Sequence, residues 1–164
     1  MSPTPEQRYV QRLADEFRTS KYDVKTLMRS VFLSPEFIND QSYRALIKSP
    51  TEYMVSALKA LKAPQLSQVA VDSAANMGQQ LFDPPDVGGW PNNDGWISSN
   101  TVMARVNFVS GVLGRLRSLP AAKDAHQLQL DGVLSAGTAK LLSQAPDDRT
   151  RWMVALMAPE FTLK

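Results

Sequence analysis

Signals that start helices recur along this chain, and they constrain its fold more than any other feature. The segment Ser49–Glu52 places a serine N-cap before a proline at the first helical position and a glutamate that can bond back to the cap. Thr4–Gln7 has the same order, with Thr4 as the expected N-cap and Gln7 in the place of the glutamate. Ser34–Phe37 also places a serine before a proline, followed directly by a glutamate. No stretch alternates apolar and polar residues with the period of two that half-buried strands require. The sequence therefore predicts an all-α fold.

Apolar residues at helical spacing extend these starts into six to eight expected helices. Val24, Leu27, Met28 and Val31 are expected to face inward on the second helix, and Leu81 to end the inward face of the fourth. Ser34–Phe37 is expected to form a short helical turn with Ser34 as its cap. The longer helices are expected over residues 4–17, 20–34, 49–63, 63–82, 99–117, 134–143 and 148–157.

The length of 164 residues suits one domain, which would bury about 70% of its unfolded surface. A boundary within Ser118–Gly132 would leave too short a C-terminal piece for an independent domain, so residues 1–164 are predicted to form a single helical domain. The chain has no cysteine, which excludes disulfides and thiolate chemistry. Its single histidine, His126, excludes a multi-histidine metal site and is interpreted as a solvated surface residue. No apolar run approaches the roughly 20 residues of a membrane span.

Charge is distributed unevenly along the sequence. The net charge is +2, yet residues 63–104 contain four aspartates and neither lysine nor arginine. Two of the three tryptophans lie in this acidic part. A nucleic-acid-binding protein would instead place aromatic residues among basic ones. The pattern therefore argues against a nucleic-acid partner.

The acidic part centres on a long loop, Leu81–Trp96, which contains three prolines, three glycines and two tryptophans. Prolines fix φ and glycines permit positive φ, so such a loop can be stiff and sharply turned. The favoured interpretation is a structural plug, with Trp90 and Trp96 packed inward on the helix that follows. The alternative is a working surface on which the two indoles stack against a sugar or another flat apolar group.

Asp83, Asp86 and Asp94 form an acid cluster within this loop, beside Asn92 and Asn93. Their oxygens could bind calcium or magnesium, or paired carboxylates could perform acid–base chemistry. However, the spacing does not match a calcium-binding loop, and aspartate and asparagine are also the residues that turns require. We therefore expect turn chemistry, with no metal, no cofactor and no catalytic residue.

Arg105 lies by helical angle within the apolar stripe of the helix after the loop. A guanidinium in that position needs a partner or a route to solvent. The favoured hypothesis is a structural ion pair with Asp86 or Asp83. The alternative is an anion-binding arginine that faces a pocket.

Four short motifs follow one another along the chain: Ser34–Phe37, Lys48–Glu52, Phe82–Pro91 and Arg105–Asn107. They are a Ser-Pro-Glu-Phe block, a Lys-Ser-Pro-x-Glu block, a proline-rich block ending in Gly-Trp-Pro, and an Arg-x-Asn. Their order resembles the C-terminal part of a bacterial family called domain of unknown function 1800. The resemblance directs attention to Asp86, Trp90, Arg105 and Asn107.

The resemblance implies a chain that is the last part of a longer, exported protein in the periplasm or outside the cell. The function it favours is a non-catalytic binding or assembly module, whose partner is the missing N-terminal part or another exported protein. The alternative is part of a hydrolase whose active site is completed by missing N-terminal residues. A cleft that joined Asp83, Asp86, Trp96 and Arg105 would favour the hydrolase.

Overall fold

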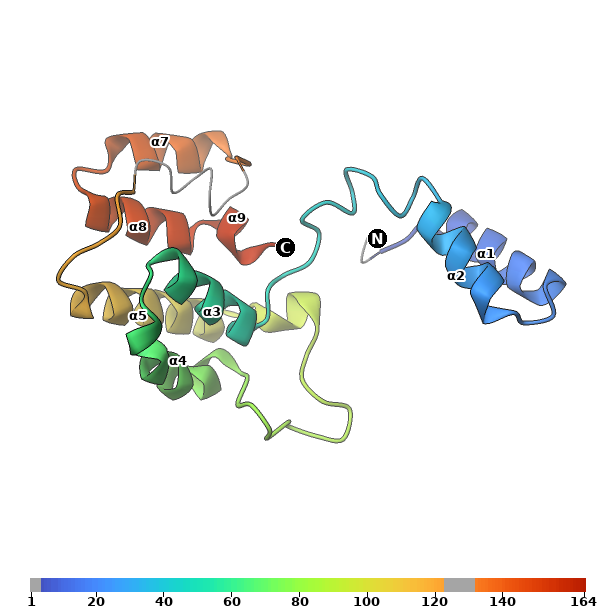
Figure 1. Cartoon of the computed structure of the whole chain (residues 1–164), viewed down its shortest axis with the longest axis horizontal. Helices are drawn as coiled ribbons and strands as arrows, with labels where there is room; N and C mark the ends of the chain where they lie inside the picture. The colour runs from blue at the N-terminus through green and yellow to red at the C-terminus, as the bar shows by residue number, and fades with distance from the viewer. Residues whose placement is uncertain (1–3, 123–131) are drawn as a thin grey trace. The chain divides into compact units, whose positions relative to one another are not determined.

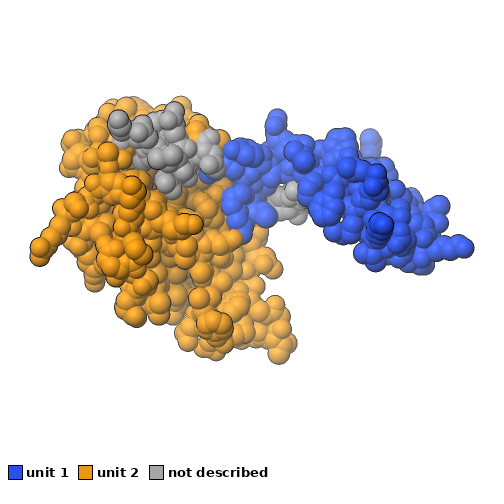
Figure 2. Space-filling model, in the orientation of Figure 1, with its two compact units in different colours: residues 1–46, 164 blue, residues 47–163 orange. Residues whose placement is uncertain are grey.

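The computed structural model describes residues 4–122 and 132–164, so His126 lies outside the described residues. The described residues form eight α-helices and no β-strand, which confirms the all-α prediction. The chain divides into two compact units, residues 1–46 with 164 and residues 47–163, which are coloured separately in Figure 2. Whether residues 1–164 fold as one domain stays a prediction. Figure 1 labels the helices α1 Gln7–Thr19, α2 Val24–Leu33, α3 Pro50–Ala60, α4 Ser67–Ala74, α5 Ser99–Arg115, α7 Ala136–Gln144, α8 Asp148–Met157 and α9 Pro159–Thr162.

The first unit is built on the pair α1 and α2, which pack against each other. α1 begins at Gln7, later than predicted, because Glu6 still has an extended backbone with φ −60° and ψ 141°. The prediction of Thr4 as the N-cap is therefore wrong. Asp23 caps α2 by accepting hydrogen bonds from the backbone N–H groups of Lys25 and Thr26.

Ser34 ends α2 instead of starting a new helical turn. Its hydroxyl donates to the carbonyl of Val31 at 2.9 Å and lies 3.0 Å from the hydroxyl of Tyr9. An oxygen engaged with the helix before it is not placed to cap a helix after it. The residues after Ser34 form a turn, in which the N–H of Phe37 donates to the carbonyl of Ser34 at 3.1 Å, but no helix follows. The predicted role of Ser34 as a cap is therefore wrong.

The apolar face of α2 is only partly covered. Leu27 and Val31 are half-buried, as the helical spacing predicts. Val24 and Met28, predicted to face inward, are instead exposed. The prediction failed because α2 carries apolar residues on a wider arc than α1 covers.

The second unit surrounds a core at the middle of α3, α5 and α8. α5 packs against both α8 and the end of the α4 segment. Buried side chains from all three helices and from α9 meet in one cluster, whose members include Tyr53, Phe108, Leu113, Leu156 and Phe161. α8 has the predicted bounds, and α5 ends two residues earlier than predicted.

The helix predicted over residues 63–82 is broken into shorter pieces. Single 3₁₀ turns at Pro64–Leu66 and Ala75–Met77 flank α4. Gly78 then adopts a left-handed conformation with φ 89°, which ends the helical path because such a residue closes a helix C-terminus. Leu81, predicted to face inward, is consequently exposed in the loop.

The two ends of the second unit lie side by side. Ile47 and Leu163 form an isolated antiparallel bridge. The N–H of Lys48 donates to the carbonyl of Thr162 at 2.7 Å. The second unit is therefore closed by backbone hydrogen bonds between its first and last residues.

No helix of the described residues has both the length and the apolar character needed to cross a bilayer.

Ser49 forms the predicted capping box at the start of α3. Its hydroxyl accepts the N–H of Glu52 at 3.3 Å, and the Glu52 carboxylate accepts the N–H of Ser49 at 2.9 Å. We expect Ser49→Ala to lower the free energy of unfolding by about 1 kcal/mol, the usual contribution of an N-cap. Urea denaturation of the two proteins measures the difference, and equal stabilities would show that the cap contributes nothing.

Glu160, on α9, joins the end of the chain to the start of α7. Its carboxylate accepts the N–H of Ser135 at 2.8 Å and the hydroxyl of Thr138 at 3.0 Å. Burial alone would raise the pKa of the Glu160 carboxyl, but hydrogen bonds from Ser135 and Thr138 outweigh it and lower that pKa. The ionised carboxylate is therefore favoured by the folded state.

A group with a lowered pKa stabilises the fold above its unfolded pKa, and the contribution is lost as pH falls through the folded pKa. We therefore expect Glu160→Gln to destabilise the protein at pH 7 and to lose that effect on acidification below the ordinary glutamate pKa of 4.5. Urea denaturation of both proteins at pH 7 and at about pH 3 measures this. A stability difference that stays constant with pH would contradict the assignment.

Candidate functional site

The loop Leu81–Trp96 is fixed at both ends and exposed in the middle. At its start, the side-chain oxygen of Gln79 accepts the N–H of Thr51 at 3.0 Å. Toward its end, the side-chain oxygen of Asn93 accepts the N–H of Ile47, also at 3.0 Å. Between these ties, Phe82 is 96% exposed and Val87 is fully exposed. The loop thus presents apolar side chains to its surroundings.

The three aspartates of the loop serve its own turns. Asp86 accepts the N–H of Gly88 at 2.6 Å, and Asp94 accepts the N–H of Gly95 at 3.1 Å. Asp83 accepts the side-chain amide of Gln80. All three are exposed. Within residues 4–122 and 132–164, no three acidic or histidine side chains gather closely enough to hold a metal ion.

The two tryptophans differ in burial. Trp96 is 6% exposed and lies at the end of a 3₁₀ turn, Asn93–Trp96, directly before α5. Its carbonyl accepts the hydroxyl of Thr101, which belongs to the capping box of α5. Trp90 is half-buried, and its ring Nε1 is buried without a hydrogen-bond partner among the described residues. The buried side chain of Trp96 agrees with the plug interpretation. The half-buried side chain of Trp90 agrees with it less well.

Arg105 is buried, as its position in the apolar stripe predicts, with 4% of its surface exposed. Its Nη2 donates to the carbonyl of Lys48 at 3.3 Å. Its Cζ lies 4.6 Å from the ring centroid of Tyr53, within the range of a cation–π contact. Nε and Nη1 are buried and have no partner among the described residues.

The predicted ion pair between Arg105 and Asp86 or Asp83 is absent from the described residues, and that hypothesis is wrong. The aspartates are engaged in turns at the exposed part of the loop, whereas Arg105 contacts the start of α3. A carbonyl and an aromatic ring take the place of the carboxylate. The charge of Arg105 therefore has no anion beside it in the described part of the chain.

The surroundings of Arg105 shift two pKa values. Burial lowers the pKa of the Arg105 guanidinium, because a low-polarity environment disfavours the charged form. Burial raises the pKa of the Tyr53 hydroxyl, and the nearby charge of Arg105 only partly opposes the change. The hydroxyl of Tyr53 stays protonated and donates to the carbonyl of Leu156 at 2.9 Å. Tyr53 is therefore not poised for proton transfer near neutral pH.

Arg105 and Tyr53 line a pocket of about 290 Å³ between the N-terminal half of α5 and the α8–α9 corner. The rest of its lining is mainly apolar: Ile97, Val102, Val106, Met157, Pro159 and Thr162. We call this the Arg105 pocket. Its volume is near the lower end of the range for small-molecule sites. An apolar cavity with one cation on its wall is suited to bind an organic anion.

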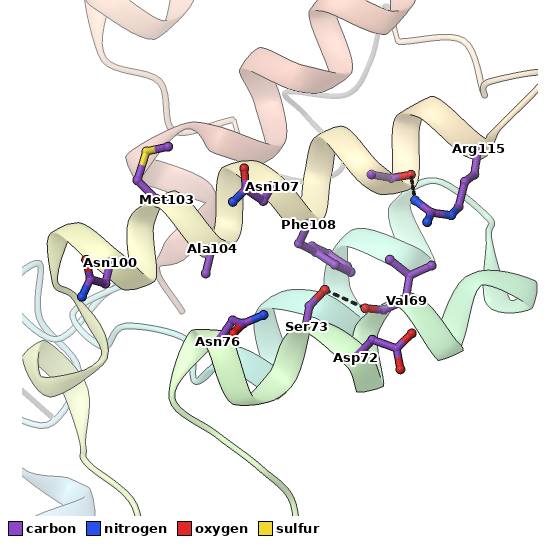
Figure 3. Close-up of a pocket in the computed structure, with 11 residues that line it drawn as sticks. Val69, Asp72, Ser73, Asn76, Asn100, Met103, Ala104, Asn107, Phe108 and Arg115 are labelled. Atoms are coloured by element: carbon purple, nitrogen blue, oxygen red, sulfur yellow. Dashed lines mark hydrogen bonds between the residues drawn. The ribbon is translucent and has the colours of Figure 1, made fainter.

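Asn107 lies away from this pocket, in a groove of about 600 Å³ between α4 and α5. Figure 3 shows the lining residues, with Ser73 and Asn76 on one side and Asn107 on α5. Residues two positions apart point to different faces of a helix, which separates Asn107 from Arg105. The groove is open and largely polar, and its Arg115 donates to the carbonyl of Gly111 at 2.9 Å.

The structure thus separates the residues that the sequence grouped. Asp83, Asp86 and Asp94 lie in exposed turns, Arg105 lines the pocket, and Asn107 lines the groove. The sequence did not identify Tyr53 and Lys48 as partners of Arg105. One signal was present, because the helical spacing of α3 places Tyr53 on the face that packs on α5. No sequence pattern marks a backbone carbonyl such as that of Lys48.

The family model described as "Protein of unknown function (DUF1800)" matches residues 1–163. Because the match covers nearly the whole sequence, the chain belongs to this family. No curated protein and no solved structure is significantly similar to it.

Arg105 offers a direct test of the unpaired charge. We expect Arg105→Met to raise the free energy of unfolding by about 1 to 2 kcal/mol, because methionine fills similar space without burying a charge. Arg105→Ala is expected to be less stable than Arg105→Met, since it empties the space that the side chain occupies. Urea denaturation at pH 7 ranks the three proteins. A methionine variant less stable than the natural chain would indicate that Arg105 has a compensating partner.

Proposed function

We propose that the chain is a non-catalytic binding or assembly module of a larger exported bacterial protein. The observation that carries the proposal is an apolar stripe on α2, formed by Val24, Met28 and Phe32. These residues recur every four positions and are 61%, 43% and 50% exposed. An exposed apolar stripe on a helix is typical of a surface that another polypeptide covers.

The corner after α2 and the long loop support the same proposal. Leu33 and Ile38 extend the apolar surface of the first unit. In the second unit, Phe82 and Val87 project from a loop that hydrogen bonds hold at both ends. Apolar side chains on a fixed loop can enter a pocket of a partner at low entropic cost. We infer that the partner is a protein with an apolar surface, either a preceding part of the same protein or another exported protein.

The hydrolase alternative has no supporting observation in the described residues. Asp83 and Asp86 are exposed and engaged in turns, and neither lines the pocket of Arg105. Trp96 is absent from that lining as well. The cleft that would have favoured an enzyme is therefore not formed by these residues.

Photo-crosslinking tests the proposal. A photoreactive phenylalanine analogue is placed at position 32 in cells that naturally produce the protein. We expect it to crosslink to one discrete polypeptide, which mass spectrometry identifies. The matched control is the same analogue at Leu141, which is 57% exposed on α7 but outside the stripe. Val24→Glu should abolish the association without lowering the melting temperature, because this side chain of the stripe is 61% exposed. Absence of a product at position 32, or identical products at both positions, would refute the proposal.

A further inference from the structure

We propose that the Arg105 pocket binds a carboxylate attached to a short apolar group. The inference is independent of the α2 stripe, because it rests on a buried cation and a cavity in the second unit. Three observations carry it: the missing counter-ion of Arg105, the apolar lining of the pocket and the presence of Arg105 in that lining.

The first observation is that Arg105 has no counter-ion among the described residues. A guanidinium stays charged at any pH that proteins experience, so Arg105 cannot remove its burial cost by losing a proton. Its partners in the described residues are the carbonyl of Lys48 and the ring of Tyr53. Neither carries a formal charge, since the Tyr53 hydroxyl is protonated. The N–H groups on Nε and Nη1 have no acceptor among the described residues. An anion in the pocket would supply the missing opposite charge.

The chemistry of the pocket selects the class of anion. A carboxylate matches the planar guanidinium and forms charge-assisted hydrogen bonds with it. The described residues that line the pocket include Arg105 but no lysine, aspartate or glutamate. A second anionic group, as in a phosphate diester chain or a dicarboxylate, would therefore have no partner there. Ile97, Val106 and Met157 instead offer contacts for an alkyl group.

Two sources could supply this chemistry: a free short-chain acid, or the C-terminal carboxylate of a polypeptide that ends in an apolar residue. The cavity of about 290 Å³ accommodates either a short alkyl chain or one apolar side chain. Both place the carboxylate at Arg105 and the apolar group among the side chains of α5 and α8. The experiment below separates the two sources.

The test follows the methyl signals of Ile97, Val106 and Met157 by NMR during titration of the whole chain. One arm compares hexanoate with hexanamide, which has the same shape and no charge. The second arm compares an acetylated tetrapeptide that ends in a free leucine carboxylate with the same peptide amidated. We expect saturable methyl shifts with at least one carboxylate, and affinity about tenfold or more weaker for its amide.

Two variants complete the test. Arg105→Met keeps the pocket folded and should abolish the preference for carboxylate over amide. Arg115→Met removes an exposed arginine on the same helix and should leave binding unchanged. Binding by hexanoate alone identifies a free acid as the ligand, and tighter binding by the peptide identifies a chain terminus. No saturable shift with either carboxylate, equal affinity for an amide, or full affinity in Arg105→Met would overturn the proposal.

Discussion

Replacement of Tyr53 by alanine is expected to lower the free energy of unfolding by about 4 kcal/mol, within the range for emptying a buried aromatic site. Tyr53 is fully buried on α3. Its ring lies 5.4 Å from the ring of Phe161, edge to face, and beneath the guanidinium of Arg105. Alanine would leave a cavity and would remove the aromatic face that Arg105 contacts. Urea denaturation at 25 °C measures the loss.

Tyr53→Phe is the control that separates packing from hydrogen bonding. It keeps the ring and removes only the hydroxyl that donates to Leu156, so the expected loss is about 1 kcal/mol. A loss as large as that of Tyr53→Ala would assign the effect to the hydroxyl. A loss below 1 kcal/mol for Tyr53→Ala itself would show that the site collapses without cost, contrary to the packing described above.

Trp96→Ala is expected to cost about 3 kcal/mol, at the lower end of the range for a large aromatic residue. The side chain is almost fully buried where the loop joins α5. Trp90→Ala is expected to cost less, because Trp90 keeps contact with solvent and its Nε1 lacks a partner. Thermal denaturation of the two variants in parallel measures the order. A larger loss for Trp90→Ala would place the centre of the plug earlier in the loop.

A binding assay extends this comparison to the sugar-stacking alternative. If Trp96→Ala left stability unchanged, the plug interpretation would fail and an exposed role for the indole would have to be considered. Half-buried Trp90 is the more accessible of the two rings for stacking. Titration of simple sugars against tryptophan fluorescence, in the natural chain and in Trp90→Ala, would reveal such binding.

Local signals determined how much of the fold could be predicted. The bounds of α8 and the cap of α3 were predicted correctly, because caps and helical spacing act within a few residues. The α4 segment was predicted too long, because the apolar spacing continues past Gly78 to Leu81, whereas the left-handed backbone of Gly78 ends the helix. The inward face of α2 was wrong at Val24 and Met28, because what covers a helix depends on neighbours that the spacing does not identify.

The candidate site was predicted to a smaller extent. The burial of Arg105 followed from its angle on α5, but its partner did not. The sequence suggested Asp86 or Asp83 as that partner, and the turn at Gly88 uses the Asp86 carboxylate. The actual acceptor is a carbonyl at Lys48, 57 positions earlier in the chain, and any residue type provides a carbonyl. Candidate ion pairs can be recognised in a sequence from the charges of the side chains. A backbone acceptor can be identified only once the fold is known.

The bridge between Ile47 and Leu163 has a consequence for chain connectivity. Bridged residues are separated by about 5 Å, so the entry and exit of residues 47–163 are neighbours. A segment with adjacent entry and exit can be spliced into a host loop without stretching either chain. Residues 47–163 therefore have the geometry of an insertable cassette, and their order can in principle be circularly permuted. A short linker joining Leu163 to Ile47, with new ends opened in the exposed stretch at Val87, would preserve every helix of the cassette.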